Sequence, residues 1–186
     1  MRLRADELPP GRQAGGRRET LAVAGERKVE TFPFRADEPA AVVAAMGRLS
    51  AAGDGWVNLR PTVDGEDDDR PSALRFFTLL SGGGPGLTMG TWVPAAPGQR
   101  GRERARLGLT HRAGRRAVAA LAAGGAAVPA GWLVEQDHPT RGLVVRPLPD
   151  APAGTVVAFA LGALSALSVP GAIRGWRAEV HLPRSA

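Results

Sequence analysis

The sequence predicts an α/β (α+β) protein in which a mixed or mainly antiparallel sheet is covered by two to three helices. Short apolar runs of strand length alternate along the chain with segments whose apolar residues recur at helical spacing. Three times, a segment rich in small and aliphatic residues is followed by a Gly-Trp pair that opens a strand, at Trp56, Trp132 and Trp176. Since 186 residues are enough for one sizeable core, we expect a single domain over residues 19–186.

The N-terminal part of the chain contains one clear helix and several short strands. Residues 1–18 are polar, are interrupted by prolines and glycines, and are expected to form a disordered extension. Apolar runs over 21–34 predict one or two strands, and Pro33 places such a strand at an edge or ends it. After Pro39, apolar residues continue at helical spacing as far as Gly53, which predicts a helix ended by glycine. Further strands are expected at 55–63, 74–80 and 87–93, with an acidic loop at 64–69.

The C-terminal part has the element order β-α-β-β-α-β, which is that of a ferredoxin-like unit. A strand at 103–111 alternates between apolar and basic residues, and a helix over 112–123 follows it. The next two strands are spaced as a hairpin, and a helix and a last strand complete the order. Residues 27–93 and 103–182 could therefore be two pseudo-repeats within the domain. The remaining elements are expected at 132–136, 142–145, 155–168 and 175–182.

Apolar residues also indicate how the helices pack. The tryptophans of the Gly-Trp pairs are expected to be buried where each preceding helix meets the sheet, because tryptophan supplies a large apolar area. The uncharged run over 151–173 is long enough to be weighed as a membrane span, but two prolines shorten its helix to about 17 residues. We therefore expect a buried helix, a cytoplasmic protein and no stable membrane insertion. Small residues at four-residue spacing would let this helix pack closely on a neighbour: Ala158, Gly162 and Ala166.

The charge of the chain is positive and unevenly distributed. The formal net charge is +6, and all the basic residues except Lys28 are arginine. Residues 36–70 carry a net charge of −5, whereas residues 71–116 carry +7. Such asymmetry indicates either an anionic partner or two oppositely charged segments that face one another. The absence of cysteine excludes a disulfide framework, thiolate metal sites and a thiol nucleophile.

Histidines at the ends of three predicted strands are candidates for chemistry. His111 ends the strand at 103–111, His138 follows Asp137, and His181 ends the last strand. In the expected element order, His111 could converge with Asp137 and His138 in one crevice, whereas His181 would lie at the opposite edge. Such a crevice could hold an acid–base pair for catalysis. The alternative is that these are surface or capping histidines, and a metal site of three histidines is disfavoured.

The sequence lacks the common cofactor and nucleophile motifs. The glycine-rich segment 82–86 has no lysine, and Pro85 removes an amide that a phosphate loop would need. The acidic run at 64–69 lacks the ligand spacing of a calcium loop, and no G-x-S-x-G elbow occurs. We therefore expect neither a cofactor nor a resident metal.

The strongest functional signal is a run of seven arginines opposed by a single nearby acid, Glu103. Alternation places Arg104 and Arg106 on one face of the predicted strand. Guanidinium groups bind phosphates through paired hydrogen bonds, so these residues could contact nucleic acid or a phosphorylated ligand. No tryptophan or phenylalanine lies between residues 93 and 131, which disfavours binding by base stacking. This arginine stripe consists of Arg100, Arg102, Arg104, Arg106, Arg112, Arg115 and Arg116.

Three functions are compatible with these patterns. The favoured one is a non-catalytic binding or accessory module whose arginine stripe contacts an anionic partner. The alternative is a small enzyme that uses His111, Asp137 and His138 in a crevice. A third hypothesis is a structural or protein–protein interaction subunit, such as a homo-oligomer in which acidic and basic segments of different chains pair.

Overall fold

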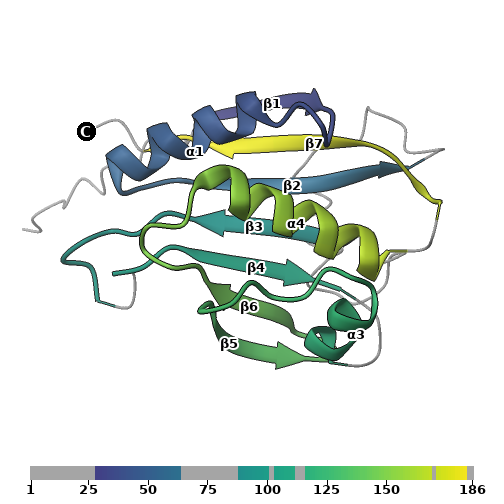
Figure 1. The fold of residues 1–186 in the computed structure, drawn as a ribbon. Coiled ribbons are helices and arrows are strands. Elements are labelled where there is room, and N and C mark those ends of the chain that lie inside the picture. The colour runs from purple at the N-terminus through teal and green to yellow at the C-terminus, as the bar shows by residue number, and fades with distance from the viewer. Residues whose placement is uncertain (1–27, 64–87, 101–102, 112–115, 169–170, 184–186) are drawn as a thin grey trace, which may run out of the picture.

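The computed structural model describes residues 28–63, 88–100, 103–111, 116–168 and 171–183. In this part of the chain three helices lie on one side of a large sheet, so that the molecule has two layers (Figure 1). The expected extension at 1–18, the acidic loop at 64–69 and the strand at 74–80 lie outside the described residues.

Seven described strands form the sheet, and each pairs antiparallel with its neighbours. The spatial order is β1-β7-β2-β3-β4-β6-β5, so the last strand lies between the first two rather than at an edge. This position requires a long connection from the far side of the sheet, which α4 provides (Figure 1). The strands are β1 (Val29–Phe34), β2 (Trp56–Val63), β3 (Met89–Val93), β4 (Arg106–Thr110), β5 (Leu133–His138), β6 (Gly142–Arg146) and β7 (Ile173–His181).

The described helices are α1 (Ala40–Ala52), α3 (Ala117–Ala123) and α4 (Ala153–Leu167). A proline precedes the first residue of both α1 and α4, where its missing N–H removes no helical hydrogen bond. α1 ends at Gly53, whose φ of 64° is a left-handed conformation that glycine adopts without steric cost. α4 contacts the central strands β2, β3 and β4, and α3 contacts β5 and β6.

The core lies between the helices and one face of the sheet. Successive strand residues point to opposite faces, so Leu59, Leu109 and Leu143 fall in one buried row across β2, β4 and β6. Gly90 of β3 belongs to the same row, and a Cβ there would lie 3.4 Å from Leu164 of α4. The missing side chain at Gly90 thus lets α4 approach the sheet closely.

The small residues of the last helix approach the segment that follows α3 and not the sheet, since a Cβ at Gly162 would lie 3.8 Å from Ala126 and one at Gly124 would lie 3.3 Å from Ala166. Ala158, Gly162 and Ala166 are exposed, whereas the larger apolar residues of α4 are buried against the sheet. The reason is that burial of valine, leucine and phenylalanine side chains stabilises the fold more than burial of alanine or glycine. None of the helices in the described ranges is long and apolar enough to cross a membrane.

The three Gly-Trp tryptophans have different environments. Trp176 is buried in the core, and Trp132 is half-buried with its ring edge-on to that of Phe159 in α4. Trp56 is half-buried, but its neighbour Val57 faces the core, so strand alternation turns Trp56 away from α1. The expectation that each tryptophan packs its preceding helix onto the sheet is therefore wrong for Trp56. Trp92, which the repeat did not include, is a core residue.

The fold is α+β, with an antiparallel sheet of seven strands and helices on one of its faces. From β4 to β7 the chain does follow the order β-α-β-β-α-β, but a ferredoxin-like fold is not confirmed. β7 pairs with β1 and β2 instead of with the strands of its own half, and the sheet is larger than that fold. The single domain and the pseudo-repeats 27–93 and 103–182 stay predictions.

Candidate polar binding face

The sheet face turned away from the helices carries polar and charged side chains. Directly paired residues of antiparallel strands point to the same side, so the register places Asn58, Thr91 and Glu179 in one row. The same register pairs Arg60 with Arg177 and Trp56 with His181. We call this surface the polar face. Its main residues are Trp56, Asn58, Arg60, Thr91, Arg106, Gly108, Glu135, Arg146, Arg177, Glu179 and His181.

A hydrogen-bonded network occupies the centre of the polar face. Asn58 and Glu179 are only 6% and 8% exposed. The Thr91 hydroxyl donates to Asn58 Oδ1 at 2.9 Å, which fixes the orientation of the amide. Asn58 Nδ2 then donates towards Glu179 Oε2 at 3.4 Å and lies 3.3 Å from His181 Nε2. Because the amide nitrogen is a donor, a hydrogen bond at this contact needs the tautomer of His181 in which Nε2 accepts.

Two arginines flank the buried carboxylate of Glu179. Arg60 Nη2 lies 3.3 Å from Glu179 Oε2, and both side chains are 11% exposed. The Nε of Arg60 is buried and finds no hydrogen-bond partner within the described ranges. Arg177 stands directly across from Arg60 on β7. Two arginines thus lie at this end of the polar face, and one of them is bound to Glu179.

Trp56 and His181 form an aromatic stack at the opposite end of the same two strands. Their ring centroids are 4.3 Å apart, and the planes are inclined by 15°. The His181 imidazole contacts the Asn58 amide, and the Trp56 indole stacks on the imidazole. The stack is therefore tied to the central network through His181.

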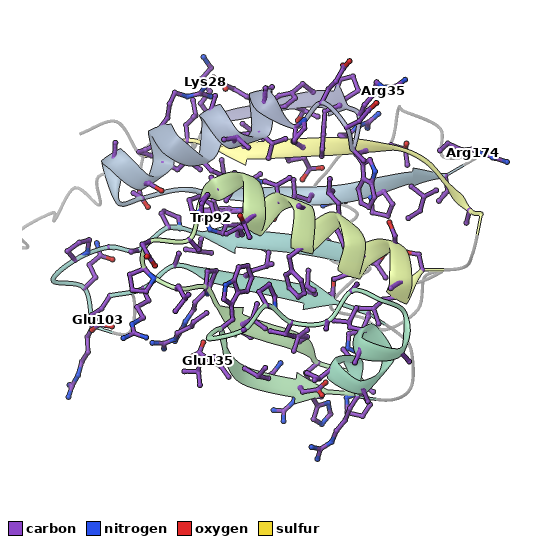
Figure 2. The ribbon with its side chains drawn as sticks, in the orientation of Figure 1. Lys28, Arg35, Trp92, Glu103, Glu135 and Arg174 are labelled. Carbon is purple, nitrogen blue, oxygen red and sulfur yellow. The ribbon has the colours of Figure 1, made fainter. Side chains whose placement is uncertain are left out.

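A second ionic cluster lies towards the β5 edge of the polar face. Arg106 Nε lies 3.0 Å from Glu135 Oε2, and Arg146 Nε contacts the other carboxylate oxygen. The pairing of β5 with β6 shifts register between Val134 and Gln136, and Glu135 lies in this bulge. Figure 2 shows Glu135 beside β5 and β6, far from Arg35 at the β1 edge. Two arginines and one glutamate leave this Arg-Glu-Arg cluster with a net positive charge.

The predicted catalytic crevice stays a prediction, although two of its residues, His111 and Asp137, lie close enough to interact. His111 is 3% exposed, and burial lowers its pKa, while the negative charge of Asp137 acts to raise the same pKa. The Asp137 carboxylate accepts hydrogen bonds from the backbone N–H groups of Ala117 at 2.6 Å and Val118 at 3.3 Å. Asp137 therefore caps the first turn of α3, although it follows this helix in sequence.

The other two histidines have different surroundings. His138 Nδ1 accepts hydrogen bonds from the backbone N–H groups of Thr140 and Arg141, so its ring orders the β5–β6 turn. His181 belongs to the polar face, on a strand that does not contact β5 or β6 in the sheet. Across the described ranges, no group of three or more histidine or acidic residues is placed to hold a metal ion.

The arginine stripe does not form one continuous strand face. β4 begins at Arg106 rather than at 103, and Arg104 is exposed in the bend before it. Arg100 and Arg116 are also exposed outside β4, and only Arg106 lies on the polar face. The remaining members, Arg102, Arg112 and Arg115, lie outside the described residues.

Sequence reasoning missed Asn58, Arg60, Arg177 and Glu179. The available signal was the alternation of polar residues with core residues in β2 and β7, for example Asn58 between Val57 and Leu59. This alternation does not tell which strands are neighbours. Asn58 and Glu179 are 121 residues apart in the chain and meet only because β7 inserts beside β2.

Comparison of the chain with models of protein families, with curated proteins and with solved structures found no match.

Proposed function

We propose that the protein binds an anionic partner through the polar face. Among the described residues, the paired strands bring four arginines and two glutamates, Glu135 and Glu179, to this surface. Guanidinium groups bind phosphate or carboxylate oxygens through paired, charge-assisted hydrogen bonds. The arginines are Arg60, Arg106, Arg146 and Arg177.

The observation that carries this proposal is the pairing of Arg60 with Arg177 above a buried carboxylate. In the proposed complex an anion contacts both of these guanidinium groups. The Arg60 side chain is held by Glu179, and Glu179 is held by Asn58. A group that is already ordered loses little conformational entropy on binding, which favours affinity.

Three double variants, each losing two positive charges, test the proposal. Arg106→Gln with Arg177→Gln removes charge from the polar face, and Arg100→Gln with Arg104→Gln removes it from the exposed stripe. Lys28→Gln with Arg48→Gln is the matched control, since both residues are exposed and lie outside the polar face. Binding of heparin and of oligonucleotides is measured by fluorescence anisotropy at two salt concentrations.

We expect the polar-face variant to bind more weakly and with a flatter salt dependence, because each lost phosphate contact lowers the slope of log K against log salt. The control should bind as the wild type does. Absence of polyanion binding by the wild type, or an equal loss in all three variants, would contradict the proposal. A loss confined to Arg100 and Arg104 would assign binding to the arginine stripe instead.

The alternative of a small enzyme rests on one observation, the buried His111 near Asp137. A desolvated imidazole is a suitable general base. Against this, both Asp137 oxygens bind the α3 backbone and His138 Nδ1 binds the hairpin turn. The binding function is therefore the better supported of the two. We also propose that the protein acts in the cytoplasm.

A further inference from the structure

Exposed apolar residues gather at the β5 edge of the sheet. Four large apolar side chains are exposed in the described ranges, and three of them lie on or beside β5: Leu133, Val134 and Leu148. A Cβ at Gly131 would lie 3.4 Å from the Leu148 side chain, so Leu148 lies next to the start of this strand. Single exposed leucines are common on protein surfaces, whereas a group of them beside one strand indicates an interaction site.

β5 is an edge strand that lacks the usual protection by proline. It pairs with β6 alone among the described strands and lies at the end of the sheet opposite β1 (Figure 1). β1 contains Pro33, which has no N–H for the addition of a strand, whereas no proline lies within β5. The bulge at Glu135 limits regular pairing along β5 to a few residues. Side chains beside this edge must therefore supply most of the affinity for a partner.

Two arginines adjoin the exposed leucines. Leu133 pairs directly with Arg146, so both side chains point to the polar face with their Cβ atoms about 5 Å apart. Arg106 and Arg146 both bind Glu135, and the Arg106 side chain is 41% exposed. Two guanidinium groups have more N–H donors than one carboxylate can accept, so donors remain for a second carboxylate. We call Leu133, Leu148, Arg106 and Arg146 the edge patch.

The edge patch suits a ligand that combines carboxylates with aliphatic side chains. Carboxylates bind guanidinium groups through paired hydrogen bonds, and aliphatic groups that pack on Leu133 or Leu148 are removed from water. Residues two positions apart in an extended peptide lie about 7 Å apart and point to the same side. A leucine that packs on Leu133 would therefore place an acidic residue two positions away beside Arg146.

Nucleic acid matches the edge patch less well. Its phosphates could bind the arginines, but its bases stack on aromatic or planar groups, and the exposed apolar residues at this edge are aliphatic. Aliphatic side chains beside an open strand are instead typical of surfaces that bind an extended peptide.

From these arrangements we propose that the edge patch binds an extended acidic segment of a partner protein, in which aliphatic and acidic residues stand two positions apart. The carboxylates bind Arg106 and Arg146, and the aliphatic side chains pack on Leu133 and Leu148. This inference rests on the proposed anion-binding function, and it specifies the partner and the part of the polar face that the partner occupies.

The test uses the full-length protein and three labelled probes of equal charge. They are an acidic peptide that contains leucines, the same peptide with serine in place of each leucine, and a single-stranded oligonucleotide. Leu133→Ser removes an apolar side chain from the edge patch, and Arg106→Gln removes a charge. Val29→Ser is the matched control, because Val29 is exposed at the opposite edge of the sheet. Circular dichroism establishes that each variant is folded.

We expect the wild type to bind the leucine peptide about tenfold more tightly than the serine peptide, because partial burial of a leucine side chain contributes on that order. Leu133→Ser should lose most of this preference and bind the serine peptide as the wild type does. Arg106→Gln should weaken binding of both peptides and flatten its salt dependence. Val29→Ser should bind every probe as the wild type does.

Three results would overturn the inference and leave the proposed function in place. Equal binding of the two peptides by the wild type would show that the polar face binds anions without apolar contacts. Tighter binding of the oligonucleotide than of the leucine peptide would assign a nucleic acid to this surface. An equal loss in Leu133→Ser and Val29→Ser would exclude the edge patch as the place of contact.

A fourth result would overturn both proposals. If the wild type binds none of the three probes, the proposed function fails together with the inference. The comparison of the two peptides needs only the wild type, so it remains decisive even if a variant does not fold.

Discussion

The side-chain amide of Asn58 connects the central network of the polar face with the aromatic stack. Asn58 accepts from Thr91, donates towards Glu179 and contacts His181, so one side chain joins strands β2, β3 and β7. Burial of Asn58 makes each of these hydrogen bonds costly to lose, since no water replaces them fully.

Asn58→Asp should lower the free energy of unfolding by about 2–3 kcal/mol. The change keeps the shape of the side chain but replaces the donor with a carboxylate that faces Glu179, and loss of a hydrogen bond to a charged group costs on that order. Thr91→Val is the matched control, which should cost about 1 kcal/mol because it removes one neutral hydrogen bond. Urea unfolding at pH 7 measures both. Equal stability of Asn58→Asp and the wild type would show that the amide does not organise the face.

His111 should make stability depend on pH. Burial lowers the pKa of His111 in the folded protein below its ordinary value near 6.5, so the unfolded chain binds the proton more readily. The stabilising contribution is therefore fully present above pH 6.5 and is lost as the pH falls towards the lowered pKa of the folded state. Urea unfolding between pH 5 and pH 8 measures this slope, which is at most about 1.4 kcal/mol per pH unit.

His111→Leu should flatten that slope, whereas His138→Gln, which leaves His111 in place, should retain it. An unchanged slope in His111→Leu would mean that other groups cause the pH dependence. At the residue scale, the Asp137 charge acts on the pKa of His111, while the catalytic role that the sequence suggested for the pair stays a prediction. The sequence could not indicate that Asp137 is a helix cap, because the capped residues precede it in the chain.

At the scale of single elements, α3 depends on a cap from another element. It has only seven residues, and a helix of this length is not stable by itself. Asp137→Ala should lower the free energy of unfolding by about 1 kcal/mol, as expected for a lost N-terminal cap. Asp150→Ala, which removes an exposed carboxylate, is the control and should have little effect. Thermal unfolding compares the two variants, and equal melting temperatures would exclude a capping role for Asp137.

Two glycines form a matched pair, one in the connection between α1 and β2 and the other within α1. Gly55 has a φ of 90°, and a Cβ there would overlap the backbone carbonyl oxygen of His181. Gly47 lies exposed within α1, and a Cβ there has no neighbour within 4 Å. Gly55→Ala should therefore disrupt the pairing of β2 with β7, while Gly47→Ala should stabilise the protein by about 0.5–1 kcal/mol. Chemical denaturation measures both, and a tolerated Gly55→Ala would mean that the turn can rearrange.

Element types were more predictable than the surfaces they bury. Helical spacing and strand alternation located α1, α4, β2 and β7 within a few residues, because these patterns arise from local backbone geometry. The exposed side of α4 was not predictable from its small residues. In a helix that is apolar all round, periodicity does not define one face, and the position of the sheet decides which residues are buried.

At the scale of the whole molecule, the position of β7 links the two ends of the chain. β1 pairs only with β7 among the described strands, and β2 pairs with β7 along most of its length. This arrangement also creates the polar face, since Arg177, Glu179 and His181 all come from β7. Strand order was the part of the fold that the sequence could not provide, because strand patterns specify faces but not neighbours.

Fragments 1–100 and 101–186 should not fold separately, even if they correspond to pseudo-repeats. The first would contain β1 and β2 without the strand that joins them, and the second would expose both edges of β7. An equimolar mixture should regain the thermal unfolding transition of the intact protein, as measured by circular dichroism. Cooperative unfolding of either fragment alone would instead support two independent folding units.

The ribosome makes β7 after all the other described strands, although its place is inside the sheet. Until residue 181 is synthesised, β1 has no neighbour and the facing edge of β2 is unpaired, leaving a gap of one strand. Such edges can pair with strands of other chains, so a nascent chain is most prone to aggregation shortly before translation reaches its last strand. Slow codons between α4 and β7 would prolong this interval. A chaperone that covers the gap would reduce aggregation during it.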